Sequence, residues 1–325
     1  MKRIRASTAV LAIIVFASLV PGIGANAQEW PTKPVRLVVP FPPGIFDLMA
    51  RVIGQHLSSQ LGQPFLVDNR PGAGGNIGTA VAANSAPDGY TLVLSSSGPL
   101  TSNKFLYKSI PFDSIKDLTP IILVGDIPGI LAAHPDVQAR NLRELADLAH
   151  ARPGQLSIGS PGTGTNTHLG IELYKKLANV DMLHVPFKGA VPAMTNLMAG
   201  NVQLAFALVP DYVKPILAGR LKGVAVFSRS RFPALPDVPT AIEQGIDMEV
   251  SGSIALMGPA GLPRPIVDRI NREINDYLKS SEGETRLVQI GVRVIGGPPE
   301  RVTSMIEKEW SIWKPVIDSA RVKID

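Results

Sequence analysis

Short apolar runs rich in β-branched residues alternate along the chain with longer segments in which apolar residues recur every three or four positions. The run Val35–Val39 is typical of a buried strand, and apolar residues at 48, 49, 52, 53, 57 and 61 form the stripe of a following helix. The same unit recurs and predicts strands at residues 64–68, 90–94, 121–124, 155–159, 182–185, 204–208 and 223–227. Strands interleaved with helices predict an α/β fold whose parallel sheets are covered on their faces.

Two apolar, glycine-containing stretches look like crossings between domains rather than loops. They are IILVGDIPGILAA at 121–133 and MEVSGSIALMGP at 248–259. Crossings there predict a discontinuous first domain, residues 28–126 plus 250–325, and a second domain, residues 127–249. Helical patterns at 263–279 and 298–319 close the chain, each with proline near its first turn. A space between two such domains is the usual place for a small ligand.

The N-terminal segment, residues 1–27, has the layout of a cleavable secretory signal peptide. Three basic residues precede an apolar run from Ala9 to Val20, and the segment ends in Ala25-Asn26-Ala27. A membrane anchor is the alternative, but a span needs about 20 apolar residues and Pro21 ends this run earlier. We therefore expect cleavage after Ala27 and a mature chain that begins at Gln28.

Charge and composition narrow the function classes. Loss of the signal peptide leaves 29 Lys and Arg against 27 Asp and Glu, with no basic cluster, so we expect no nucleic-acid partner. The chain has no cysteine, and its five histidines show no metal-binding spacing, so no metal site or cofactor is expected. No Gly-x-Ser-x-Gly pentapeptide occurs either. A secreted hydrolase, or another small-molecule enzyme using the same cleft, is therefore an alternative without a visible motif, and we expect no enzyme.

The segment NRPGAGGNIG at 69–78 resembles a phosphate-binding loop, but its details exclude a nucleotide site. No lysine follows the last glycine, as a Walker loop requires, and the glycine spacing does not fit the dinucleotide fingerprint. Its remaining interpretation is a glycine turn that leads into a helix near Asn76.

Ordered sequence blocks give the chain a family resemblance from about Trp30 to its C-terminus. The blocks are KPVRLVVPFPPG (33–44), VDNRPGAGGNIGT (67–79), APDGYTLVL (86–94), ARPGQLSIGSPGTGTNTHL (151–169), VDMLHVPFKGAVPAMTNLMAGNVQLAF (180–206) and FPALPDVPTAIEQG (232–245). In this order and spacing they resemble the Bug family, the extracytoplasmic solute receptors of tripartite tricarboxylate transporters. In that family NRPGAGGNIG is a structural signature of the scaffold.

The resemblance implies a two-domain periplasmic-binding-protein fold of the venus-flytrap kind, type II, with a ligand cleft between the domains. It also implies a monomer in the periplasm that captures a small organic carboxylate and presents it to transporter membrane subunits. The sequence does not name the ligand.

Two loops at strand ends are the candidate carboxylate grip. After the first strand, Phe41, Gly44, Phe46 and Asp47 lead into a helix whose first N–H groups and positive dipole end point beyond the strand. Ser160, Thr163, Gly164 and Thr165 do the same on the other domain. The alternative is that each loop is only a capped turn, in which Thr165 or Asn166 is an ordinary N-cap.

Further candidates rest mainly on the resemblance, and each has a plain structural alternative. His168 borders the pocket in the family pattern or supports its loop, and Lys188 lies at the cleft or is simply solvated. Serines after residue 94 donate to a ligand or cap a turn, and Asp211 lines the cleft or is a surface acid at a helix start. The additional candidate ligand-binding residues are therefore Ser96, Ser97, His168, Lys188, Phe206 and Asp211.

The first loop departs from the family pattern, which places glycines and small residues between Pro43 and Asp47. Here Gly44, Ile45 and Phe46 make that loop one residue shorter and bulkier. Three outcomes are open: a narrower site, a ligand with an apolar or aromatic body, or loss of binding. Ala207 stands where many relatives have a polar group, so an amino-acid ligand would lose a possible ammonium partner.

Overall fold

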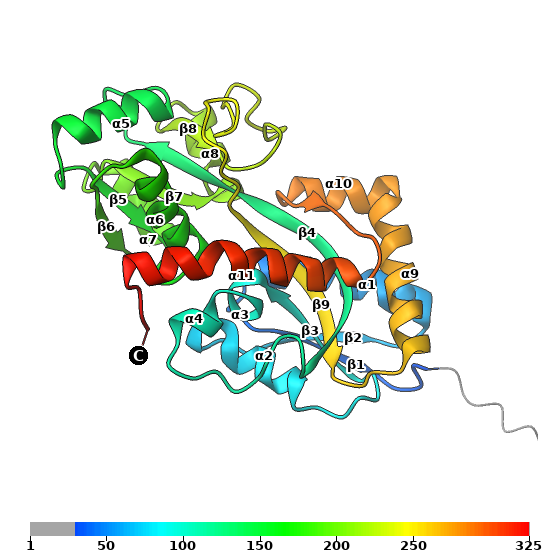
Figure 1. Cartoon of the computed structure of the whole chain (residues 1–325). Helices are drawn as coiled ribbons and strands as arrows, with labels where there is room; N and C mark the ends of the chain where they lie inside the picture. The colour runs from blue at the N-terminus through cyan, green and yellow to red at the C-terminus, as the bar shows by residue number, and fades with distance from the viewer. Residues whose placement is uncertain (1–29, 325) are drawn as a thin grey trace, which may run out of the picture.

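The computed structural model describes residues 30–324 and shows two lobes that share one sheet (Figure 1). The strand order is β2-β1-β3-β9-β4-β7-β5-β6, and β8 and β10 each pair with β4. The predicted signal peptide, residues 1–27, lies outside the described residues. Among the described residues, no helix is both long enough and apolar enough to cross a bilayer.

The first lobe is built on parallel strands that are each followed by a helix. β1 (Val35–Val39) pairs in parallel with β2 (Phe65–Asn69) and with β3 (Thr91–Ser96). α1 (Ile45–Leu61) buries its apolar stripe in the core and ends at Gly62, whose left-handed backbone favours glycine. The other elements are η1 (Ala73–Gly75), α2 (Asn76–Ala83), α3 (Ser97–Leu100), α4 (Asn103–Leu106), α9 (Arg264–Lys279), α10 (Ser281–Gln289) and β10 (Arg293–Val294).

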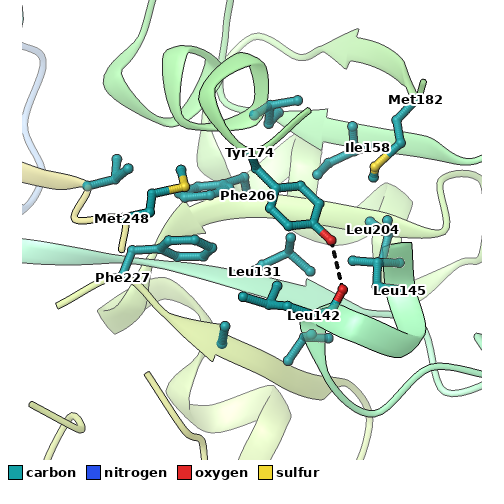
Figure 2. Close-up of a cluster of buried hydrophobic side chains, with 14 of the residues drawn as sticks. Leu131, Leu142, Leu145, Ile158, Tyr174, Met182, Leu204, Phe206, Phe227 and Met248 are labelled. Carbon is teal, nitrogen blue, oxygen red and sulfur yellow. Dashed lines mark hydrogen bonds between the residues drawn. The ribbon is translucent and has the colours of Figure 1, made fainter. Parts of the chain in front are cut away.

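The second lobe repeats this logic on a smaller scale. β5 (Ser157–Ser160) lies between β6 (Leu183–Pro186) and β7 (Leu204–Leu208) and is parallel to both. Its core holds Phe206 against Phe227, with ring centroids 4.5 Å apart, and the Tyr174 hydroxyl donates to the Leu142 carbonyl at 3.0 Å (Figure 2). The other elements are α5 (Leu142–Ala151), α6 (Asn166–Ala178), α7 (Ala190–Met198), α8 (Val209–Leu217) and β8 (Lys222–Val226).

Two long antiparallel strands connect the lobes. β4 (Leu118–Ala133) pairs with β9 (Ser251–Pro259) up to Pro128 and with β7 from Gly129 onward. A Cβ atom at Gly129 would meet the Phe206 ring at 2.7 Å, so only glycine fits at this change of partner. The division into residues 28–126 plus 250–325 and residues 127–249 remains a proposal, which the change of partner supports.

α11 (Glu300–Ala320) lies across both lobes alongside β4 (Figure 1, red). Val302 and Ile306 on its first half are buried in a first-lobe core cluster. Trp313 and Ile317 on its second half are buried in the second-lobe core. One helix therefore completes the cores of both lobes.

The predicted α/β class is confirmed, and the sheets are parallel within each lobe as expected. The structure adds antiparallel pairing by β4, β8, β9 and β10, which the alternation of strands and helices did not predict. β4 has 16 residues, whereas the apolar run predicted a strand only at 121–124. The helix that was expected to begin near Asp47 begins two residues earlier, at Ile45.

Candidate functional site

Helix N-termini gather at the carboxyl ends of the parallel strands in both lobes. α1 and α3 follow β1 and β3, and α6, α7 and α8 follow β5, β6 and β7. Because parallel strands end at the same edge of a sheet, the helices of each lobe begin at one edge. Of these helices, only α6 has a side-chain cap, so the first N–H groups of the others are free of side-chain acceptors.

The two edges meet at Asn166, the first residue of α6. Its Nδ2 donates to Ser97 Oγ of α3 at 2.6 Å and to the Ser251 carbonyl at the start of β9 at 3.0 Å. These bonds join the second lobe to the first across sequence separations of 69 and 85 residues. We call the region around the contacts of Asn166 with Ser97 and Ser251, at the carboxyl ends of the parallel strands of both lobes, the junction.

An aromatic pair borders the start of α1. The rings of Phe41 and Phe46 stack with centroids 4.6 Å apart, and both side chains are half-buried. Asn69 Nδ2 donates to the Phe41 carbonyl at 3.1 Å, and a Cβ at Gly75 would touch the Phe41 ring at 3.2 Å. The NRPGAGGNIG segment therefore packs against Phe41 and holds its loop in place, which agrees with a scaffold role.

The backbone at the start of α1 remains available to a ligand. Gly44 is exposed and forms the uncapped N-cap of the helix, and Leu48 N is the first amide that bonds back to Gly44 O. The amides of residues 45–47 precede that first helical bond, so they can donate to an anion near the positive end of the dipole.

Asp47 is engaged within its own helix. Its two carboxylate oxygens accept from Arg51 Nε and Nη2, each at 2.9 Å, one helical turn later. The carboxylate is also close to the helix N-terminus, where a negative charge is favourable. This arrangement argues against direct ligand binding by Asp47 and gives it a structural role in α1.

In the loop of residues 160–165, polar side chains form hydrogen bonds within the loop itself. Thr165 Oγ1 accepts from His168 N at 3.2 Å as the N-cap of α6, and it lies 2.8 Å from the Gly162 carbonyl. Gly164 is buried with φ of 76°, and a Cβ there would clash with the Ile324 side chain. Thr163 is exposed. The capped-turn alternative is thus supported for Thr165, which leaves backbone groups and Thr163 for a ligand.

The buried Ser160 and His168 and the half-buried His184 form a polar cluster next to this loop. Ser160 Oγ lies 2.7 Å from His184 Nε2, the two imidazoles stack with centroids 3.8 Å apart, and His168 Nδ1 accepts from Gly164 N at 2.9 Å. Burial lowers the pKa of His168 to about 3, helped by His184 and Lys175, and burial lowers the pKa of His184 to about 4. Both rings are therefore neutral near pH 7, and they fix the loop.

The Ser160–His184 pair resembles a nucleophile and its base, which bears on the hydrolase alternative. Ser160 is fully buried at 0% exposure, so a substrate cannot reach its hydroxyl in this conformation. We therefore interpret the pair as structural.

The remaining predicted residues fall into distinct environments. Phe206 is fully buried in the second-lobe core, which argues against contact with a ligand. Ser96 and Ser97 are buried at the end of β3, and Ser97 meets Asn166. Lys188 is exposed after β6 and has no ion pair within residues 30–324.

Asp211 lies in the first turn of α8 with its surface exposed to solvent. Surrounding protein nevertheless raises the pKa of its carboxyl by desolvation. Asp211 therefore stays a candidate on the strength of its place in the first turn of α8, which follows β7.

Sequence reasoning missed the inter-lobe role of Asn166, which was considered only as an N-cap. Its signal is the amide side chain one residue after the true N-cap, where it is free to reach outward. The contribution of the Ser251 carbonyl has no signature in the side-chain pattern.

Two surface cavities of the first lobe lie apart from the predicted site residues. One, of about 570 Å³, is between α9 and the segment that leads into α11, and the other, of about 450 Å³, is between α1, α9 and α10. Within residues 30–324, no group of three or more His, Asp or Glu side chains is placed to hold a metal ion.

Comparisons with known proteins agree on one family. The family model described as the tripartite tricarboxylate transporter family receptor, TctC, matches residues 49–322. Protein BugT of Bordetella pertussis is 35% identical over 322 residues, covering 98% of this chain and 99% of BugT. A protein from a tcbD–tcbE intergenic region of a Pseudomonas species is 36% identical over 317 residues, 96% of this chain and 94% of that relative.

Solved structures show the same architecture. Rpa4515 of R. palustris with adipate has a TM-score of 0.81 at 33% identity, covering 90% of this chain and 98% of that one. The periplasmic binding protein BugD has a TM-score of 0.77 at 32% identity, covering 90% and 99%. MatC of Rhodopseudomonas palustris with bound malate has a TM-score of 0.76 at 31% identity, covering 89% and 100%.

Proposed function

Because this chain belongs to the receptor family of tripartite tricarboxylate transporters, we propose that its junction binds a small organic dicarboxylate between the lobes. The family resemblance predicted from the sequence is confirmed, and so is the two-lobed solute-binding fold. The protein is a solute-binding receptor, and the chemistry of its solute is the part that we propose.

The observation that carries the proposal is the meeting of helix N-termini from both lobes at the Asn166–Ser97 contact. Free backbone N–H groups and the positive ends of helix dipoles favour a carboxylate on each side. One carboxylate at α1 and a second at α6 would hold a ligand that has two acidic ends. Adipate in Rpa4515 and malate in MatC are both dicarboxylates, which supports this choice.

The proposal includes a place and a partner. We propose that the segment 1–27 directs the chain to the periplasm, where it acts as a monomer and delivers its ligand to transporter membrane subunits. The family assignment supports this, since its receptors work outside the membrane. The hydrolase alternative has no support in the matched relatives, which are binding proteins.

A calorimetric titration of the chain beginning at Gln28 tests the ligand class. The panel is acetate, malate, adipate and citrate, with melting temperatures measured in parallel, because a ligand of the native state stabilises it through mass action. We expect malate or adipate to bind more tightly than acetate. Equal, weak responses to all four compounds would refute a dicarboxylate site.

Replacement of Ile45 by proline tests the backbone grip directly. Proline is tolerated at the first helical position, yet it removes one N–H that precedes the helical bonding pattern. We expect Ile45→Pro to weaken the preferred dicarboxylate by about 1.5–3 kcal/mol, the range for a hydrogen bond to a charged group.

Two controls separate that N–H from other effects. Ile45→Ala removes the side chain but keeps the amide, and Ser281→Pro makes the same backbone change at the start of α10, away from the junction. Both should bind as the wild type does. If Ile45→Pro and Ile45→Ala have equal affinities, α1 does not hold the carboxylate through its amides.

A further inference from the structure

A carboxyl group of α11, that of Glu309, is hydrogen-bonded beneath the junction. Its Oε2 lies 2.9 Å from Thr101 Oγ1, and its Oε1 accepts from Ser253 Oγ at 3.0 Å. Thr101 and Ser253 are buried, with exposures of 0% and 6%. The carboxyl therefore contacts the first lobe just after α3 and the crossing strand β9 together.

The hydroxyl of Thr101 has more acceptors than protons. Besides Glu309 Oε2, it lies 2.6 Å from the Ser97 carbonyl oxygen, which also accepts from the Thr101 amide. A threonine hydroxyl has a single proton and can complete only one of these two bonds at a time. Both short distances are satisfied together if Glu309 carries a proton and donates it to Thr101 Oγ1.

The same residues continue to the inter-lobe contact. Ser97 is the first residue of α3, and its carbonyl accepts hydrogen bonds from the hydroxyl and the amide of Thr101. Its own hydroxyl accepts from Asn166 of the second lobe at 2.6 Å. Trp310 Nε1 also donates to the Thr101 carbonyl at 3.2 Å, which fixes Thr101 against α11. A change at Glu309 can thus reach Asn166 through two intervening residues.

We propose that Glu309 is a positioning residue: its protonated carboxyl directs the Thr101 hydroxyl to the Ser97 carbonyl and so holds the α3 turn that meets Asn166. Ionised Glu309 instead accepts a hydrogen bond from the Thr101 hydroxyl, which then no longer donates to the Ser97 carbonyl, and the Ser97 turn loosens. The effect on affinity rests on the proposed function of the junction, whereas the proton arrangement does not.

The surroundings of Glu309 favour the neutral carboxyl. Glu309 as a residue is half-buried, but its carboxyl is enclosed by protein, and this burial raises its pKa from 4.5 to about 7. The effect exceeds the lowering by its three hydrogen-bond partners, and the negative charge of Asp126 adds to the rise. Asp126 is itself held by Arg293, with bonds of 2.9 and 2.6 Å. Other titratable or charged groups on adjoining elements include Lys104 of α4, His168, Glu172, Lys175 and Lys176 of α6, Glu249 before β9, and Glu307 and Lys308 of α11.

Nuclear magnetic resonance of the ligand-free chain tests the proton arrangement. Trp313 Nε1 lies 3.4 Å from Glu309 Oε2, so its indole N–H signal reports ionisation of that carboxyl. The side-chain amide signals of Asn166 report the far end of the network. In the wild type we expect both sets of signals to titrate together near neutral pH.

Three variants locate the coupling. Glu309→Gln keeps a neutral group of the same shape and should abolish the titration of both signals. Thr101→Val should leave the Trp313 titration in place and remove that of Asn166. Glu307→Gln, an exposed acid on the same helix, should behave as the wild type. If the Asn166 signals stay constant while Trp313 titrates in the wild type, or if Thr101→Val leaves both titrations unchanged, the proposal is wrong.

Adipate and malate titrations at about pH 6 and about pH 8.5 then measure the consequence for binding. We expect wild-type affinity to fall about fivefold at the higher pH, the equivalent of one neutral hydrogen bond, and to stay constant in Glu309→Gln. Equal pH dependence in both proteins would overturn the link to affinity. If neither compound binds at either pH, the dicarboxylate assignment fails, and the resonance titrations still decide the role of Glu309.

Discussion

At the scale of single residues, several polar side chains of the junction hold its loops together, and backbone amides are left free to bind a ligand. Thr165, His168 and Asp47 all satisfy partners in their own segments. Residue type alone made them ligand candidates, because a hydroxyl, an imidazole and a carboxylate can serve a cap as readily as a ligand. The sequence therefore indicated the right loops, and the internal hydrogen bonds became visible only in the fold.

Thr165→Ala separates these two roles. The threonine caps α6, so its loss should lower the free energy of unfolding by about 0.5–2 kcal/mol. Dicarboxylate affinity should change less than stability, because the hydroxyl is already bonded within the loop. Chemical denaturation of this variant gives the free energy of unfolding, and calorimetry gives the affinity. A large loss of affinity at unchanged stability would show that Thr165 contacts the ligand directly.

Phe46→Ala tests whether the aromatic pair selects the body of the ligand. Removal of one ring of the Phe41–Phe46 stack exposes apolar surface beside the α1 amides. We expect affinity for adipate to fall by about 1–2 kcal/mol, since each buried methylene is worth about 0.8 kcal/mol, while malate, with its shorter and hydroxylated body, changes little.

Leu48→Ala is the matched control for that substitution, because Leu48 is an exposed apolar residue on the same helix. It should leave both affinities as they are. Equal losses for adipate and malate in Phe46→Ala would indicate damage to the loop rather than selection of the ligand body.

At the scale of elements, the periodicity of apolar residues predicted those helices and strands that bury one face or form a short apolar run. α1, α9 and α11 follow such stripes closely. The sequence pattern did not predict α10 or β10. α10 has only two buried residues, and the two residues of β10 are too few to show a periodic pattern of apolar positions. Strand pairing across the lobes depends on residues far apart in the chain, so no local pattern could reveal it.

α11 should make the stability of the chain depend on pH. Because the pKa of Glu309 is raised from 4.5 to about 7, the folded state holds a proton that the unfolded state releases. Its stabilising contribution is complete below about pH 4.5 and is lost as pH rises toward about 7, by at most about 3 kcal/mol.

Urea unfolding across that pH interval, compared between wild type and Glu309→Gln, measures this contribution. The difference in unfolding free energy between the two proteins should change with pH from 4.5 to about 7 and level off above it. Parallel pH profiles for the two proteins would show that Glu309 has an ordinary pKa.

At the scale of the whole molecule, the lobes also touch at Gly291 and Pro210. A Cβ atom at Gly291 would clash with the ring of Pro210, at the start of α8 in the second lobe. Gly291→Ala should therefore hold the lobes apart and weaken dicarboxylate binding about tenfold or more, the effect of at least about 1.4 kcal/mol.

We expect the two lobes to close on a bound ligand, and small-angle scattering with and without adipate or malate measures this closure. Wild type should contract on saturation, and Gly291→Ala should contract less. Gly261→Ala is the matched control: its φ of 79° is close to the 84° of Gly291, and nothing lies within 4 Å of its added Cβ. If both variants bind and contract alike, contact at Gly291 does not limit closure.

The path of the chain through the lobes also has a consequence for biosynthesis. β9 lies between β3 and β4 in the first-lobe sheet, and Trp313, Val316 and Ile317 complete the second-lobe core. Neither lobe can finish its core until almost the last residue has been synthesised, and contacts so distant in sequence make folding slow. We therefore expect neither lobe to reach its native fold while the chain is still emerging, which would keep the polypeptide in the state that a narrow translocation channel requires.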